Sequence, residues 1–168
     1  EIADLLSLDF VVPNFHATGK KQALQELAGL AAKLTGQPER AIFDVLLERE
    51  RLGTTGIGNG IAIPHGKIAG LDHLHGLFVR LTNGVPFDAI DDEPVDLIFL
   101  LLAPETAGAD HLTALARVSR LLRDRTMCDK LRGSDDRSAP YPFLSPPAAS
   151  DPAEGPPPPG QPRPDGAP

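Results

Sequence analysis

A histidine that follows a glycine-rich stretch is the residue of this chain best placed to do chemistry. Residues 53–67 read GTTGIGNGIAIPHGK, and the four glycines allow backbone turns that are closed to other residues. The apolar run 61–63 predicts a short buried strand, which Pro64 ends because it has a fixed φ and no N–H. His65 is therefore expected at a strand end, between a rigid proline and a glycine.

Three common motifs do not fit this stretch. A Walker phosphate-binding loop requires G-x-x-x-x-G-K followed by Ser or Thr, whereas Gly60 is one residue too far from Gly66 and Ile68 replaces the hydroxyl residue. A dinucleotide-binding fingerprint requires G-x-G-x-x-G between a strand and a helix, but these glycines have another spacing and precede a strand. The G-x-S-x-G segment of serine hydrolases is absent from the sequence.

The sequence predicts neither a metal site nor a cofactor site. His73 and His75 offer two nitrogen ligands, but no carboxylate or cysteine pattern accompanies them. We interpret them as solvated histidines of a loop and a strand. The acidic run 91–93 is interpreted in the same way, as charges exposed in a turn.

With those motifs and sites set aside, the chemistry that fits His65 is nucleophilic catalysis by its own imidazole. A neutral imidazole can accept a phosphoryl group on nitrogen and pass it on, provided that hydrogen-bond donors bind the phosphoryl oxygens. Arg49 can provide two donors. His111, near the N-terminus of a helix, is expected to donate as a neutral ring because the helix end disfavours its charged form. The backbone N–H groups expected to bind the phosphoryl group are those of Gly58, Asn59, Gly60 and Gly66.

Two helices precede the glycine-rich stretch. The first is predicted over residues 18–34, with Thr18 as its N-cap, and the second over residues 39–52. At about 100° per residue, Arg49 lies beside the apolar stripe of the second helix and Arg51 lies nearly opposite. We therefore expect Arg49 to point towards the interior edge and Arg51 towards water.

Strands and helices alternate along the rest of the folded part. Residues 95–103, VDLIFLLLA, form an almost unbroken apolar run that predicts a central strand buried on both faces. This alternation predicts the α/β class, with a mixed β-sheet flanked by helices on both faces. The other expected elements are strands at 10–12, closed by Pro13, and at 75–81, a turn at 83–84, a helix capped by Asp110 with Leu112, Leu115, Ala116, Ser119 and Leu122 on one stripe, and a short helix at 125–132.

Composition points to one folded domain. The chain has 168 residues, of which 41% are hydrophobic, enough for one sizeable core. Its net charge of −7 argues against nucleic acid and anionic membrane surfaces as main partners. The single cysteine, Cys128, suits a reducing compartment and is interpreted as an inert, partly buried thiol. Because no membrane-spanning run or secretion signal is recognisable, we expect a cytoplasmic protein without membrane insertion.

The last segment changes character. From Pro140 onward the chain holds 12 of its 18 prolines, including four in a row at 156–159. Such a run is incompatible with helix or central strand, so we expect a disordered, Pro-rich tail. The predicted domains are residues 1–137, which fold, and residues 138–168, which form the tail.

The stretch from Arg49 to Lys67, RERLGTTGIGNGIAIPHGK, resembles the fructose/mannitol-type enzyme IIA domains (EIIA type 2) of the bacterial phosphoenolpyruvate-dependent phosphotransferase system. The similarity continues through VPFDAIDDEPVDLIFLLLAP and looks greatest for the nitrogen-regulatory branch. It covers about residues 1–137 and is lost from Pro140, where relatives usually have another helix. The resemblance implies that His65 is phosphorylated on Nε2 and that Arg49 and His111 support the phosphate.

The resemblance also implies a phosphohistidine carrier of the HPr type as the phosphoryl donor. Two uses of the phosphate stay open. One is nitrogen or metabolic regulation through a target such as a transporter or a sensor kinase, and the other is transfer to the cysteine of a IIB domain in sugar uptake. The sequence contains no recognisable IIB or membrane segment, which favours regulation. A third alternative is a phosphorylation-inactive binding module that has kept the fold.

Overall fold

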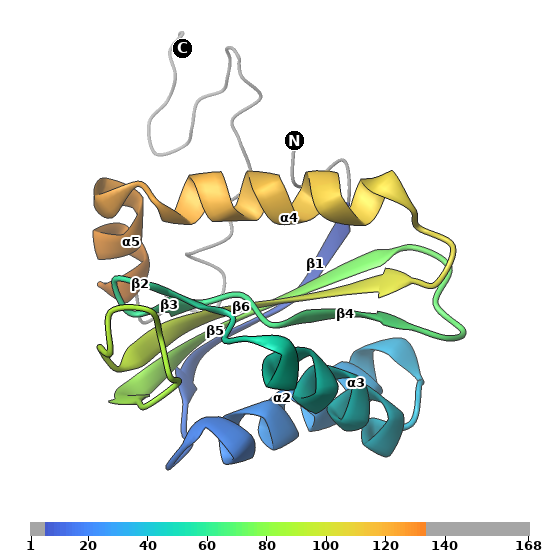
Figure 1. Ribbon diagram of the computed structural model, residues 1–168, viewed down its shortest axis with the longest axis horizontal. Helices are drawn as coiled ribbons and strands as arrows, with labels where there is room; N and C mark the ends of the chain where they lie inside the picture. Colours follow the sequence, from blue (N-terminus) through green and yellow to red (C-terminus); the bar gives the residue numbers. More distant parts are fainter. Residues whose placement is uncertain (1–5, 134–168) are drawn as a thin grey trace, which may run out of the picture.

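The computed structural model describes residues 6–133, with side chains from residue 14 onward. It consists of a mixed six-stranded sheet with helices on both faces. The elements are β1 (Leu6–Phe15), α2 (Lys20–Thr35), α3 (Glu39–Leu52), β2 (Gly56–Gly58), β3 (Ile61–Ala62), β4 (His65–Ile68), β5 (Leu74–Val85), β6 (Val95–Pro104), α4 (Ala109–Leu122) and α5 (Arg125–Arg132). Helices α2 and α3 cover one face of the sheet, and α4 and α5 cover the other (Figure 1). The expected fold class is confirmed.

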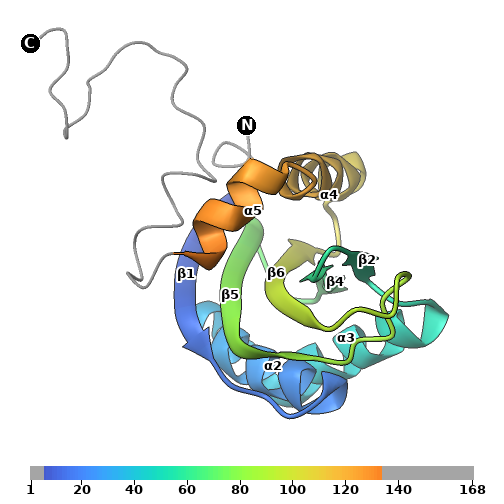
Figure 2. The same cartoon turned by 90° about the vertical axis from the view of Figure 1, so that its left-hand side faces the viewer.

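Strand β6 lies at the centre of the sheet, as its apolar run predicts. Its residues from Leu97 to Ala103 are almost completely buried, because one set packs towards α2 and α3 and the alternate set packs towards α4 and α5. On one edge β6 pairs with β5 in the antiparallel direction, and β5 pairs in parallel with β1. On the other edge β6 pairs in parallel with both β3 and β4. Figure 2 shows β4 beside β6.

Pro64 divides the segment beside β6 into two short strands. Strand β3 ends at Ala62, and β4 begins at His65, which is in register with Leu101. The Pro64 carbonyl still accepts a hydrogen bond from the N–H of Leu101 at 3.0 Å. The strand predicted over 61–63 therefore exists over two residues, and His65 opens a second strand in place of following the end of the first.

Helices α2 and α3 begin close to their predicted starts. Gly36 ends α2 with φ +75° and donates its N–H to the carbonyl of Ala32, as its left-handed conformation allows. Thr18 is not the N-cap as predicted, because that position is taken by Gly19. The Thr18 N–H instead bonds the Gln22 side chain one turn into the helix, at 2.6 Å.

Helix α4 is rotated relative to the predicted stripe. Its buried residues are His111, Ala114, Val118 and Leu122, whereas Leu112, which the sequence placed on the stripe, is 65% exposed. The N-cap is Gly108 and no side chain caps the helix, so Asp110 does not have the predicted role. The rotation carries His111 onto the face that packs against the sheet. Helix α5 has the predicted bounds.

Two strands run past residues that were expected to end them. Strand β1 continues through Pro13 because, within residues 6–133, it is an edge strand that pairs only with β5, and a missing N–H is tolerated there. Strand β5 continues through residues 83–84 to pair Val85 with Val95, so the turn predicted there is absent. The boundary predicted at residue 137 and the Pro-rich tail lie outside the described residues, and both remain predictions.

Arg80 joins helix α5 to the sheet. It lies on β5, is buried, and donates from Nη1 to the carbonyls of Leu131 and Arg132, at 3.1 and 3.0 Å. These carbonyls belong to the last turn of α5, where intrahelical donors are missing.

We expect Arg80→Met to lower the free energy of unfolding by about 2 kcal/mol, because two hydrogen bonds from a charged donor are lost. Urea denaturation measures the change. The matched variant Arg123→Met, at an exposed position, is expected to change stability by less than about 0.5 kcal/mol. Equal losses for the two variants would contradict the role of Arg80.

Candidate functional site

The ring of His65 is fixed by hydrogen bonds at both nitrogens. Nδ1 lies 2.9 Å from the carbonyl oxygen of Ile63, and Nε2 accepts a hydrogen bond from Nε of Arg49 at 3.3 Å. An arginine N–H cannot be an acceptor, so Nε2 must carry the lone pair and Nδ1 must carry the proton that it donates to Ile63. The half-buried ring is therefore held in one tautomer, with its nucleophilic nitrogen towards Arg49.

The two arginines at the end of α3 behave differently, as their helical positions predict. Arg49 reaches His65 and also donates from Nη1 to the carbonyl of Gly53 at 2.9 Å. Arg51 points away and forms an exposed ion pair with Glu48 at 3.2 Å. The guanidinium of Arg49 is thus held through both Nε and Nη1. Arg51 carries the same charge away from His65 and can serve as a control for substitutions of Arg49.

His111 lies beside His65, as the sequence predicts for a residue in the first turn of α4. The centroids of the two rings are 5.5 Å apart and the rings are tilted by 52°. His111 is buried, and within the part of the chain that the structure describes its Nε2 atom has no hydrogen-bond partner. A buried ring nitrogen without a partner is uncommon and is often found at functional sites.

The protein environment disfavours the charged forms of both rings. Burial lowers the pKa of His65 below its usual value; the hydrogen bond to Ile63 and the charge of Glu50 oppose this shift, and the charge of Arg49 adds to it. Burial also lowers the pKa of His111, with the nearby His65 and Lys67 acting in the same direction. Both rings therefore stay neutral at neutral pH, which a nucleophile and a neutral donor require.

Gly66 is required by the packing of α3 against β4. A Cβ atom at this position would lie 2.4 Å from Cγ1 of Val45, which is too close for two carbon atoms. The absence of a side chain lets α3 approach the strand that carries His65, and this approach brings Arg49 within reach of the ring. Gly66 itself is paired with Leu102 of β6.

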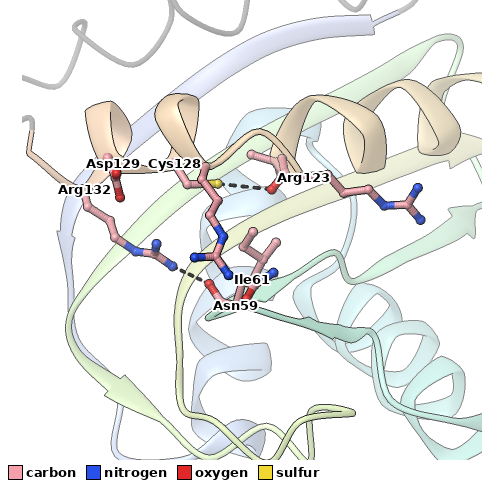
Figure 3. Close-up of a pocket in the computed structure, with 8 residues that line it drawn as sticks. Asn59, Ile61, Arg123, Cys128, Asp129 and Arg132 are labelled. Carbon is pink, nitrogen blue, oxygen red and sulfur yellow. Dashed lines mark hydrogen bonds between the residues drawn. The ribbon is translucent and has the colours of Figure 1, made fainter.

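The structure does not bring Gly58, Asn59 and Gly60 to His65. These residues form the turn before β3, where Ile61 pairs with Leu97, four residues and about 13 Å along β6 from the partner of His65. The Asn59 N–H is already bonded to Asp91 at 2.9 Å, and the Asn59 carbonyl accepts from Arg132 at 2.6 Å (Figure 3). This placement does not support the expectation that the turn binds the phosphoryl group, and the expectation stays a prediction.

The Asn59 turn borders a cavity of about 170 Å³ between the sheet and α5 (Figure 3). Cys128 lies in its wall, with its thiol directed to the carbonyl of Leu122 at 3.1 Å. Burial raises the pKa of the Cys128 thiol, which keeps it protonated and unreactive. This geometry agrees with the interpretation of Cys128 as an inert thiol.

Sequence reasoning missed Glu50, a buried carboxylate on α3 next to Arg49 in the sequence. Its side chain is 3% exposed, forms an ion pair with Lys20 of α2 at 2.9 Å, and accepts a hydrogen bond from the N–H of Thr55 at 3.1 Å. Helical periodicity gives no signal for this placement, because the partners of Glu50 lie on another helix and in a loop.

Asp72, His73 and His75 come together before and within the start of β5. One potential ligand atom from each lies within 4.8 Å of the others. Asp72 and His73 are bonded to each other at 2.7 Å, and the His73 and His75 rings have centroids 4.1 Å apart. The sequence reasoning overlooked Asp72 as a carboxylate partner of the histidines. The mutual hydrogen bond accounts for Asp72 and His73 without a metal, and the expectation of no metal site stays a prediction.

One protein family matches most of this chain. The family model described as "Phosphoenolpyruvate-dependent sugar phosphotransferase system, EIIA 2" matches residues 4–145. The chain belongs to this EIIA type-2 family. The nitrogen regulatory protein of Bradyrhizobium diazoefficiens is 56% identical over 149 residues, which cover 89% of this chain and 97% of that relative. The family expected from the sequence is confirmed, but the similarity does not end at Pro140 as expected, because the family model matches to residue 145.

Solved structures agree with this assignment. The crystal structure of nitrogen regulatory protein IIA-Ntr from Neisseria meningitidis superimposes with a TM-score of 0.80 at 33% identity, covering 86% of this chain and 99% of that chain. The Escherichia coli complex of enzyme IIA-mannitol with phosphorylated IIB-mannitol matches with a TM-score of 0.66 at 20% identity, covering 79% and 91%, and shows the shared fold. No helix within residues 6–133 of this EIIA domain is long and apolar enough to cross a membrane.

The lowered pKa of His111 predicts an acid-dependent loss of stability. As the pH falls below the unfolded-state pKa of about 6.5, the unfolded chain binds a proton that the folded chain does not, so the free energy of unfolding decreases. His111→Gln removes the titrating group. We expect urea denaturation at about pH 7.5 and about pH 5.5 to give a smaller difference for this variant than for the parent. An unchanged difference would contradict the prediction.

Proposed function

We propose that His65 accepts a phosphoryl group on Nε2 from a phosphohistidine carrier of the HPr type, and that the phosphorylation state serves nitrogen or metabolic regulation. The observation that carries the proposal is the fixed tautomer of His65, in which Nδ1 is bonded to Ile63 and Nε2 keeps its lone pair. In the transfer, the bond between phosphorus and the carrier nitrogen breaks and a bond between phosphorus and Nε2 forms. The proton on Nδ1 stays in place.

Arg49, His111 and Gly66 have separate duties in this reaction. The guanidinium of Arg49 already lies at Nε2 and would bind the phosphoryl oxygens once they arrive. Nε2 of the neighbouring His111, which has no hydrogen-bond partner among residues 6–133, can donate to an oxygen of the same group when it carries the proton. Gly66 keeps α3, and with it Arg49, close to the strand. No metal or cofactor is required, because the donor already carries the phosphoryl group.

The regulatory use is supported by relatives named nitrogen regulatory protein, which match nearly their whole length. The alternative use is transfer to a IIB cysteine. The E. coli enzyme IIA-mannitol, which shares this fold, was solved in complex with phosphorylated IIB-mannitol. A binding module that is never phosphorylated is a further alternative. A cytoplasmic location fits the proposed donor and remains part of the proposal.

Phosphorylation of His65 is tested by intact mass after incubation with phosphoenolpyruvate, enzyme I and an HPr-type carrier. We expect one acid-labile phosphoryl group on the parent and none on His65→Ala, because Nε2 is the acceptor. A folded parent that takes up no phosphoryl group would rule out the transfer mechanism and favour the binding module. Uptake by His65→Ala as well would assign the acceptor elsewhere.

The two arginines in the last turn of α3 allow a role at the phosphoryl group to be separated from a general effect of charge. Arg49→Gln is expected to lower the rate of phosphoryl transfer about 100-fold, because a donor to the transition state is lost. Arg51→Gln removes the same charge two residues away and is expected to change the rate by less than about twofold. Stopped-flow or quenched mass measurements give both rates. Similar losses in both variants would contradict the role of Arg49.

Two exposed leucines on α3 and α4 lie next to site residues in the sequence and are compatible with docking of a protein donor. Leu112 follows His111 on α4 and is 65% exposed, and Leu52, at the end of the helix that carries Arg49, is 80% exposed. Large apolar side chains exposed beside a reactive group are typical of an interaction surface. We propose that the HPr-type carrier covers these leucines when the two histidines meet.

Leu112→Glu is expected to raise the KM for the carrier about tenfold or more with little change in kcat, because the variant weakens docking and leaves the reacting groups in place. Leu112→Met keeps an apolar side chain and is expected to behave like the parent. A fall in kcat at unchanged KM for Leu112→Glu would show that Leu112 acts on the reacting groups and not on docking.

A further inference from the structure

We propose that the buried carboxylate of Glu50 is a positioning residue for His65, acting through the backbone of Thr55 and Ile63. This inference rests on the proposed phosphorylation of His65 for its effect on rate, whereas its effect on the ring can be measured without any phosphoryl donor. Glu50 does not touch the imidazole.

A continuous series of hydrogen bonds joins Glu50 to His65. The two carboxylate oxygens of Glu50 accept from the N–H of Thr55, at 3.1 Å, and from its hydroxyl. The carbonyl of Thr55 accepts from the N–H of Ile63 at 3.0 Å. The carbonyl of Ile63 then accepts from Nδ1 of His65 at 2.9 Å. Each bond orients the peptide that makes the next one.

The three groups before the imidazole in this series are shielded from solvent. Glu50 is 8% exposed, Thr55 is 4% exposed and Ile63 is 2% exposed. Water therefore cannot readily replace any of these bonds, and the loss of one leaves a buried polar group unsatisfied. The position of the Ile63 carbonyl, and with it one of the two hydrogen bonds that set the tautomer of His65, then depends on the loop that Glu50 holds.

The charge of Glu50 is balanced from the other helix. Nζ of Lys20, on α2, lies 2.9 Å from one carboxylate oxygen of Glu50 and 3.5 Å from a carboxylate oxygen of Asp88. The same ammonium group lies 5.0 Å from the centroid of the Phe87 ring. A buried ion pair adds little stability compared with apolar residues of the same size. The pair is therefore better explained by what it positions, which is the start of the loop that leads to β2.

Glu50 also contributes to the electrostatics of the ring. The charged and titratable groups that act on the His65 and His111 pair are Arg49 and Glu50 of α3, His111 of α4 and Lys67 of β4. Glu50 is the only one of these four that favours a proton on His65, since its charge raises the pKa that burial and Arg49 lower. Removal of the carboxylate should therefore lower the pKa at which His65 takes up a second proton, on Nε2, and should also loosen the hold on the Ile63 carbonyl.

The test compares Glu50→Gln with Glu48→Gln, which removes the same charge from an exposed side chain on the same helix. Ring ¹⁵N shifts of His65, recorded by NMR across a pH titration, report the tautomer and the pKa. The parent and Glu48→Gln are expected to hold the Nδ1–H tautomer. Glu50→Gln is expected to populate the Nε2–H tautomer, to titrate at lower pH and to accept the phosphoryl group at least about tenfold more slowly.

A second pair of variants keeps the test valid where Glu50→Gln does not fold. Thr55→Val removes the hydroxyl donor at nearly constant shape, and Thr55→Ser restores it. We expect the tautomer and the rate to change in Thr55→Val and to be restored in Thr55→Ser.

Three results would overturn the proposal. They are a parent ring in the Nε2–H form, equal effects of Glu50→Gln and Glu48→Gln, or unchanged tautomer and rate in Thr55→Val. A parent that takes up no phosphoryl group would instead refute the proposed function, while the ring measurements would still decide whether Glu50 positions His65.

Discussion

Strand β6 is hydrogen-bonded along both edges and buried on both faces, and the arrangement of the site depends on this constraint. Because each side chain of β6 and its neighbours must face one of two apolar layers, the register between β4 and β6 is fixed. A slip of one residue would turn His65 towards α3 and Gly66 towards α4. The ring would then lose its place beside His111, and α3 would lose the glycine that lets it approach.

The parts of the fold that could be predicted are those encoded by local patterns. The apolar run at 95–103 gave the central strand, helical periodicity separated Arg49 from Arg51, and the short helix at 125–132 has the predicted bounds. The errors lie where tertiary pairing overrides a local signal. Edge pairing carries β1 through Pro13, and the pairing of Val85 with Val95 extends β5 through a sequence typical of turns.

The functional site shows the same division. The sequence placed His65 at a strand end and His111 in the first turn of a helix, and the structure brings their rings together. The distance of the Asn59 turn from His65 could not be predicted, because it depends on the register of β3. The stripe of α4 was assigned by hydrophobicity alone, which favours Leu112 over His111, although the structure buries the histidine. The sequence pattern could not predict the burial of Glu50, because its partners lie on α2 and in a loop.

The division of the strand at Pro64 has a consequence for signalling. His65 begins a strand whose backbone is tied to β6 on one side, and its ring is tied to the Ile63 carbonyl, so neither is free to rearrange. Under the proposed function, a phosphoryl group adds between about 1.5 and 2 negative charges to this rigid face. The two states would then differ in surface potential far more than in shape. A partner that distinguishes them would read the local electric field, and its discrimination would weaken as ionic strength rises.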